Sequence, residues 1–330
     1  MSMRRLCAAA ACLIAGVSAL LCDSPAAYHI EKSAPIMGTT FIVEVYARDR
    51  ERGQRAASDA LEEVRRIDRM LSNYRGDSEL SKVNARAAVG PVQVSEELFD
   101  LLVRCRTYSE RSGGTFDVTV GPLMKVWGFY KESGHMPAAS QVQAALRTVG
   151  YNKVVLDQAT HEVRFQVRGV SLDPGGIGKG YAVDRAVIAL KRDGIDFGFI
   201  SGGGSSIFGL GTPPNNASGW PVHIQNPWNT ENIAETIYLR DRSLSTSGAF
   251  EKFFWADGHV YSHIMDPRTG YPAVGVVSVS VAAPSTLDSE IWAKPYYIQG
   301  RRWTLKHKPR DFAVYLCEDN AKRTCSWVER

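Results

Sequence analysis

The sequence predicts an α+β domain in which helices flank mixed or antiparallel sheets. Helical patterns and strand-like patterns alternate along the chain, which indicates interleaved sheets. The glycines that follow residue 174 do not form a G-x-G-x-x-G motif, so a dinucleotide-binding βαβ fold is not expected. The chain has 330 residues, of which 44% are hydrophobic, and this suffices for one large domain or two small ones.

The first 27 residues have the pattern of a secretory signal peptide. Two arginines precede an apolar run that is too short to span a membrane comfortably but suits the core of a signal. Small residues then permit cleavage, so we expect an exported, periplasmic protein whose mature domain covers residues 28–330. A lipoprotein anchored through Cys22 is a second interpretation, which the bulky Leu21 before it disfavours.

The first half of the chain contains clear strand and helix patterns. Alternating apolar residues predict a strand, and apolar residues at helical spacing predict helices that end at glycines. In chain order, these elements are a strand at 37–47, helices at 51–74 and 95–114, an apolar stretch with turn residues at 118–129, a hairpin at 152–167 and a helix at 180–194.

The second half is richer in strands. Strands are expected within 196–211 and 221–227, a turn at 266–271 before a strong strand, a helix at 285–297 and a C-terminal hairpin at 313–330. Cys317 and Cys325 would face each other across this last hairpin. They form either a disulfide, as suits an exported protein, or two unpaired thiols.

The charge of the chain argues against a nucleic-acid partner. The formal net charge is +4, and two of the contributing arginines lie in the expected signal peptide, so the mature protein is nearly balanced. No stripe of basic residues indicates nucleic-acid binding, and no cluster of cysteine or histidine indicates zinc.

The segment SLDPGGIGKGYAVDRA, residues 171–186, is similar to a phosphate-binding loop but matches none of the usual forms. Glycines and a lysine precede a helical pattern, an arrangement that points backbone N–H groups at a phosphate. A Walker A loop is excluded, because Asp173 stands where its first glycine belongs and Gly180 follows Lys179. A carboxylate would repel phosphate, so Asp173 either binds a polar heterocycle or ribose, or caps the turn.

The segment LSTSGAFEKFFWADGHVYSHIMDPRTGYPA, residues 244–273, is the second candidate for chemistry. Three hydroxyl residues at 245–247 precede Gly248 and offer polar groups in a tight turn. His263 lies shortly before an Asp-Pro-Arg-Thr-Gly turn. It is either a general base with a pKa near ambient pH or a structural histidine.

Six motifs follow one another in a recognisable order: MGTTF, LSNYRGDSELSKVN, GGTFDVTVGPLMKVWGF, DPGGIGKGYAVDRA, LSTSGAFEKFF and SHIMDPRTGYP. From about Ala34 to Gly300, the chain thereby resembles the ApbE family, the FAD:protein FMN transferases. The resemblance implies a single two-lobed, T-fold-like domain around an FAD cleft. It also implies an exported enzyme that uses magnesium to split the FAD pyrophosphate and attaches FMN to a Thr or Ser of a target protein.

The resemblance also implies roles for individual residues. His263 is expected to take the proton of the acceptor hydroxyl, and the backbone carbonyl of Gly176 is expected to bind the metal. A divalent cation suits the reaction, because it polarises the pyrophosphate and offsets charge on the leaving AMP. The residues expected to contact the flavin and adenine parts of FAD are Met37, Tyr74, Thr115, Phe116, Asp117, Asp173, Lys179 and Ile264.

The last family motif is altered in this chain. When residues 285–300 are aligned without gaps to this motif at Gly300, Glu290 falls where the family usually has a metal-binding Asp. Lys294 falls where the family usually has a Thr ligand. Glu keeps the negative charge, but a protonated Lys has no lone pair to offer a metal. Two outcomes stay open for Lys294: it turns out of the site, or its ammonium pairs with Glu290 and takes the place of the cation.

Three functions therefore stand as hypotheses. The first is an FMN transferase that acts on an exported redox protein, with the membrane nearby. The second is an FAD-binding accessory or carrier protein with an impaired metal site, and the third is an FAD pyrophosphatase with water as acceptor. The transferase and the pyrophosphatase need a divalent cation, whereas the carrier should bind FAD equally well in excess EDTA.

Overall fold

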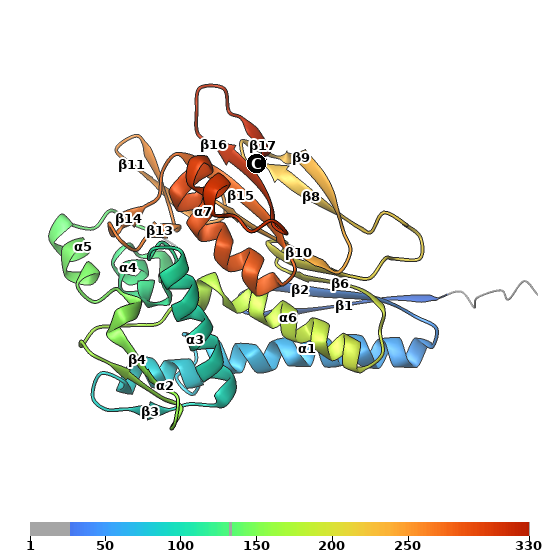
Figure 1. Cartoon of the computed structure of the whole chain (residues 1–330), viewed down its shortest axis with the longest axis horizontal. Helices are drawn as coiled ribbons and strands as arrows, with labels where there is room; N and C mark the ends of the chain where they lie inside the picture. The colour runs from blue at the N-terminus through green and yellow to red at the C-terminus, as the bar shows by residue number, and fades with distance from the viewer. Residues whose placement is uncertain (1–26, 132–133, 330) are drawn as a thin grey trace, which may run out of the picture.

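The computed structural model describes residues 27–131 and 134–329 (Figure 1). The expected signal peptide, apart from its last residue, and Cys22 lie outside these residues. Within the two described ranges, none of the helices combines the length and the apolar character that crossing a bilayer requires.

An eight-stranded sheet forms the centre of the molecule, and each strand in it runs antiparallel to its neighbours. This confirms the expected α+β class. In spatial order the strands are β1 (Tyr28–Ile36), β2 (Thr39–Ala47), β6 (Phe197–Gly202), β7 (Ser206–Leu210), β10 (Arg242–Gly248), β15 (Val276–Ala283), β16 (Ala313–Glu318) and β17 (Cys325–Trp327). The strand expected at 37–47 begins two residues later, because Met37 and Gly38 form the turn from β1.

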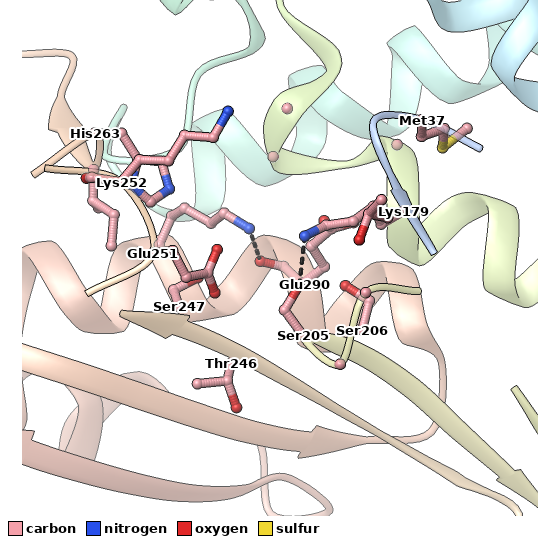
Figure 2. Close-up of a pocket in the computed structure, with 18 of the residues that line it drawn as sticks. Met37, Lys179, Ser205, Ser206, Thr246, Ser247, Glu251, Lys252, His263 and Glu290 are labelled. Carbon is pink, nitrogen blue, oxygen red and sulfur yellow. Dashed lines mark hydrogen bonds between the residues drawn. The ribbon is translucent and has the colours of Figure 1, made fainter. Parts of the chain in front are cut away.

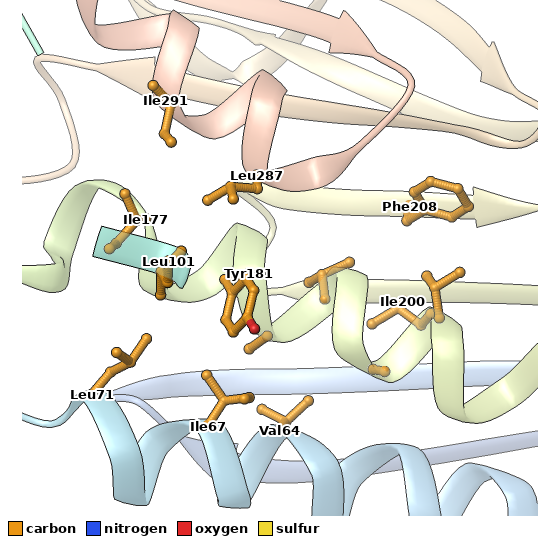
Figure 3. Close-up of a cluster of buried hydrophobic side chains, with 14 of the residues drawn as sticks. Val64, Ile67, Leu71, Leu101, Ile177, Tyr181, Ile200, Phe208, Leu287 and Ile291 are labelled. Atoms are coloured by element: carbon orange, nitrogen blue, oxygen red, sulfur yellow. The ribbon is translucent and has the colours of Figure 1, made fainter. Parts of the chain in front are cut away.

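Three long helices lie against one face of this sheet: α1 (Arg50–Leu71), α6 (Gly178–Arg192) and α7 (Thr286–His307), which is broken by a kink at Gly300. α1 contacts β1 and β2, α6 contacts β6 and β7, and α7 contacts β10 and β15. Figure 3 shows apolar side chains of all three helices meeting in one core, among them Ile67, Tyr181 and Leu287. Burying such side chains is the main favourable term in folding.

The hairpin of β8 (Trp220–Asn226) and β9 (Asn229–Leu239) packs against the sheet in a separate apolar cluster. Alternate residues of β8, namely Trp220, Val222 and Ile224, are buried and meet side chains such as Ile207 of β7. Ile207 alternates with Phe208, which belongs to the core beneath the helices, so the two clusters lie on opposite faces of the sheet.

A second lobe is inserted between α1 and α6 (Figure 1). It contains the hairpin expected at 152–167, which pairs with a third short strand in the order β3-β5-β4. The helix expected at 95–114 is confirmed as α3, whereas α2, α4 and α5 were not expected. The elements are α2 (Glu79–Arg86), β3 (Val92–Gln93), α3 (Glu96–Arg111), α4 (Gly121–Val126), α5 (Ala139–Leu146), β4 (Val154–Asp157) and β5 (Glu162–Phe165).

The remaining strands are short, and the last hairpin carries the disulfide. Two small hairpins precede β15: β11 (Phe253–Ala256) with β12 (His259–Ser262), and β13 (Met265–Asp266) with β14 (Tyr271–Pro272). Cys317 and Cys325 are direct partners on β16 and β17 and are joined by a disulfide, which decides between the two interpretations of this pair. Cys105 is free and buried.

Candidate active site

A cleft of about 1520 Å³ opens where the second lobe, the loop before α6 and the start of α7 meet. Its walls come from segments that are far apart in the sequence, and Figure 2 shows several of their side chains. All twelve residues predicted from the sequence line this cleft: Met37, Tyr74, Thr115, Phe116, Asp117, Asp173, Gly176, Lys179, His263, Ile264, Glu290 and Lys294.

Met37 reaches the cleft from the turn between β1 and β2. Its φ is 54° and that of Gly38 is 71°, so both residues of this two-residue turn are left-handed, as in a type I′ turn. The left-handed region is unfavourable for a residue with a long side chain. The turn nevertheless presents Met37 at the mouth of the cleft, and such local strain is most often found at functional sites.

Asp173 caps the short turn before α6, which is one of the two interpretations drawn from the sequence. Its Oδ1 accepts a hydrogen bond from the Gly175 N–H at 2.7 Å. Its Oδ2 accepts one from the Tyr130 hydroxyl at 2.6 Å. Burial raises the pKa of this carboxyl, while these hydrogen bonds lower it. Asp173 therefore shapes the loop, and a contact with FAD stays a prediction.

Asp117 is also satisfied by the protein itself. One carboxylate oxygen accepts from the N–H and hydroxyl of Thr119, at 2.8 and 2.7 Å, and the other accepts from the Tyr151 N–H at 2.7 Å. Thr115 beside it donates its hydroxyl to the Ser112 carbonyl. The side chains of Asp117 and Phe116 are buried, so this segment forms a rigid wall of the cleft. Tyr74, by contrast, is 78% exposed at the rim.

The first turn of α6 is held against α7 by a close contact at Gly180. The Gly180 N–H donates to Oε2 of Glu290 at 2.6 Å. A Cβ at this position would lie 2.6 Å from the Thr286 carbonyl oxygen and 2.7 Å from Glu290 Oε2, so only glycine fits. The contact holds the Glu290 carboxylate at the N-terminus of α6, where the helix dipole stabilises a negative charge.

Lys179 lies in the same first turn of α6 and extends along the cleft. Its ammonium donates a hydrogen bond to the Ser205 hydroxyl, on the turn that enters β7 (Figure 2). A cation at the N-terminus of a helix opposes the helix dipole and is favoured only where an anion compensates. The position of Lys179 therefore suits an anionic ligand in the cleft.

Lys294 does not turn out of the site, and its ammonium is not hydrogen-bonded to the Glu290 carboxylate. It remains in the wall of the cleft, and its Nζ donates to the backbone carbonyl of Glu290 at 2.9 Å rather than to the carboxylate. Burial lowers the pKa of Lys294, while the charge of Glu290 raises it. The carboxylate and the ammonium are thus held by different partners on the same wall.

His263 lies near the lysines of the cleft, after β12. Its Nδ1 is 3.1 Å from the backbone oxygen of Lys252, which can only accept, so the proton of the neutral ring sits on Nδ1. Burial, and then the charges of Lys294, Lys252 and Lys179, lower the pKa of His263 to about 4. The imidazole is therefore neutral at pH 7, and its Nε2 can accept a proton.

The expected ligands do not fit a magnesium ion. Mg²⁺ prefers oxygen ligands in octahedral geometry. Gly176 can offer a carbonyl oxygen, but one of the two carboxylate oxygens of Glu290 is engaged by Gly180, and a protonated Lys294 has no lone pair. In the described part of the chain, no three His, Cys, Asp or Glu side chains are grouped so that they could hold a metal ion.

Several cleft residues were not found by the sequence analysis. Tyr130 directly follows the apolar stretch at 118–129 and gives no signal of its contact with Asp173, 43 residues away. Lys252 falls inside the quoted motif LSTSGAFEKFF, so the motif was the only signal available for it. The β8–β9 hairpin contributes a further set of polar residues: His223, Gln225, Thr230, Glu231 and Asn232.

Comparisons with known proteins identify the family of the chain. The profile of the ApbE family matches residues 37–315. An FAD:protein FMN transferase of Salmonella typhimurium is 32% identical, over 98% of this chain and 95% of its own length. One of Treponema pallidum is 33% identical, over 96% of this chain and 92% of its own.

Solved structures show the same fold. The ApbE protein of Thermotoga maritima superposes with a TM-score of 0.84 at 27% identity, covering 92% of this chain and 97% of that one. The apo flavinyl transferase ApbE of Pseudomonas stutzeri superposes with a TM-score of 0.81 at 25% identity, covering 93% and 96%. On the family profile and these relatives together, the chain belongs to the ApbE family.

Proposed function

We propose that this protein transfers FMN from FAD to a Thr or Ser hydroxyl of an exported redox protein and releases AMP. One observation carries the proposal: all twelve predicted residues, from segments throughout the chain, line a single cleft. The relatives at 32% and 33% identity, which are named FAD:protein FMN transferases, support the same activity.

The mechanism assigns the proton transfer to His263. The acceptor hydroxyl oxygen attacks the phosphorus of the FMN moiety, and the bond from that phosphorus to the oxygen of AMP breaks. AMP leaves with the electron pair, and the hydroxyl proton passes to Nε2 of His263. The Nδ1–H bond to the Lys252 carbonyl keeps Nε2 free to receive it.

FAD is held in this proposal by the walls described above. Met37 and Phe116 offer apolar surface to the ring systems, and Lys179 offers charge to the phosphates. The resemblance to the family also suggests magnesium, but the donor set at Glu290 and Lys294 does not fit it, and the mechanism uses no step through a metal. Lys294 at a ligand position is also the observation that favours an FAD carrier as the second candidate.

The place of action belongs to the same proposal. We propose export to the periplasm after removal of residues 1–27, where the acceptor protein lies close to the membrane. The apolar leader and the disulfide between Cys317 and Cys325 support this, because disulfides persist in oxidising compartments. Mass determination of the mature protein would separate simple cleavage from lipidation at Cys22.

An incubation assay tests the function. The purified protein is mixed with FAD and an acceptor domain that carries the target hydroxyl, once with Mg²⁺ and once with EDTA. We expect flavin fluorescence on the acceptor band of a denaturing gel for the native protein and none for His263→Ala, which should still bind FAD. Release of free FMN and AMP without labelling would identify a pyrophosphatase instead. Tight FAD binding with neither product would identify a carrier.

A further inference from the structure

We propose that the ammonium of Lys294 is a built-in cation: it supplies at the FAD diphosphate the positive charge that a divalent metal would otherwise supply. The inference rests on the proposed function, because it assumes that FAD occupies the cleft. It predicts that FAD binding by this protein does not depend on a metal ion, although the family resemblance implies magnesium.

The placement of Lys294 is the first support. Its side chain crosses the cleft wall beside the loop before α6, where a Cβ on Gly176 would lie 3.6 Å from Lys294 Cε. The family resemblance expects the metal at this same Gly176. The Lys294 stem therefore occupies the neighbourhood in which the cation would be held.

The hydrogen bonding of the ammonium is the second support. An ammonium has three N–H donors, and one of them bonds to the Glu290 carbonyl. Among the described residues, no second hydrogen-bond acceptor of Lys294 is found. Lys294 lines the cleft and is only partly buried, so donors remain for the oxygens of a ligand.

The hydrogen bonding of the nearby Glu290 carboxylate is the third support. Glu290 directs Oε2 to the Gly180 N–H, and the tight packing at Gly180 keeps it there. Oε2 of Glu290 is thus used at the end of α6, and among the hydrogen bonds of the described residues the ammonium bonds to the backbone oxygen of Glu290 and not to its carboxylate. A bound anion can then compensate Lys294.

Two lysines of the cleft wall suit a diphosphate. Lys179 from α6 and Lys294 from α7 both line the cleft, and each lies close enough to contribute to the electrostatics of His263. The bridging diphosphate of a dinucleotide carries two negative charges near neutral pH, so two ammonium groups can balance it. A divalent cation at the same point would be repelled by Lys294.

Calorimetry with FAD on the cofactor-stripped, full mature protein tests the inference. In excess EDTA and in excess Mg²⁺, the native protein should bind FAD with dissociation constants within twofold of each other. Lys294→Met, which keeps the stem and removes the charge, should weaken FAD binding at least tenfold in EDTA, about 1.4 kcal/mol. Riboflavin, which lacks the phosphates, should bind both proteins equally.

Two further variants complete the test. Lys306→Met changes an exposed lysine of α7 beyond the kink at Gly300, outside the cleft, and should leave FAD binding unchanged. Glu290→Asp with Lys294→Thr restores the residue types usual in the family, so its FAD affinity should rise at least tenfold on adding Mg²⁺. This double variant keeps the test decisive if Lys294→Met fails to fold.

Three results would overturn the inference. The first is a tenfold gain in FAD affinity of the native protein with Mg²⁺, the second is Lys294→Met binding FAD as tightly as the native protein in EDTA, and the third is equal losses for FAD and riboflavin. Failure of the native protein to bind FAD in either buffer would instead refute the proposed function.

Discussion

Gly180→Ala tests the contact that joins the phosphate-loop helix α6 to α7. The added Cβ would lie 2.6 Å from a backbone oxygen of Thr286, which cannot rotate away, and 2.7 Å from Glu290 Oε2. The two helices must separate, and the 2.6 Å hydrogen bond from the Gly180 N–H to Glu290 is then lost or lengthened. The variant should therefore be less stable and should bind FAD more weakly.

The size of the effect follows from three contributions. Overpacking in a dense core costs about 1–3 kcal/mol. A hydrogen bond to a charged group contributes about 1.5–3 kcal/mol. The higher helix propensity of alanine compared with glycine stabilises the variant by up to about 1 kcal/mol. The free energy of unfolding should fall by about 2–5 kcal/mol, which corresponds to a Tm lower by roughly 3–8 °C for a domain of this size.

Differential scanning calorimetry measures this shift, and the helix offers a matched control. Gly178 lies in the same turn, and a Cβ there would meet only Pro174 Cβ at 3.9 Å, an ordinary contact. Gly178→Ala should therefore remain within about 1 kcal/mol of the native protein. Equal Tm values for the two variants would refute the argument that α6 and α7 require glycine at 180.

The remaining predictions concern the base, the disulfide and a helix cap. The neutral ring of His263 is the base, and its pKa is lowered to about 4. The single-turnover rate of FMN transfer should therefore stay level from pH 8 to 6 and fall on acidification below about pH 5. A pH–rate profile with its midpoint near pH 6.5 would contradict this. Replacing both Cys317 and Cys325 by Ser should lower the unfolding free energy by about 2.5 kcal/mol, from the entropy of the loop that the disulfide closes, and reducing agent should shift the Tm of the native protein equally. The Asp184 carboxylate accepts hydrogen bonds from the backbone N–H groups of Thr286 and Leu287, at 2.7 and 3.0 Å. Asp184→Ala removes this acceptor and should lower the free energy of unfolding, measured by urea denaturation, by about 1–3 kcal/mol. An unchanged denaturation midpoint would show that Ser285 is a sufficient cap for α7.

Long elements with a strong local pattern could be predicted from the sequence. The helices at 51–74 and 95–114 and the hairpin at 152–167 carry their periodicity within one segment, and their ends differ from expectation by only a few residues. The short helices α2 and α5 have eight residues each, too few for a clear period. The strand β9 is mostly exposed and polar, so its pairing with β8 was not visible in its own residues.

The candidate site shows the same division. The six motifs contain ten of the twelve predicted cleft residues, because motifs record residue types and spacing. They did not predict that Asp173 meets Tyr130, or that Lys294 donates to the Glu290 backbone instead of its carboxylate. The first contact depends on the distance between two segments, which no motif contains, and the second depends on the side-chain conformation that Lys294 adopts within α7.

Residue patterns were enough to predict the α+β class with its longer elements, the cysteine pair of the last hairpin and the polar residues of an ApbE-type site. How these groups meet follows from the folded chain. The packing of α1, α6 and α7 against one sheet brings the cleft residues together and turns Glu290 toward Gly180. The reason is physical: hydrophobic periodicity is local, whereas the direction of a buried charge depends on which long-range partner satisfies it.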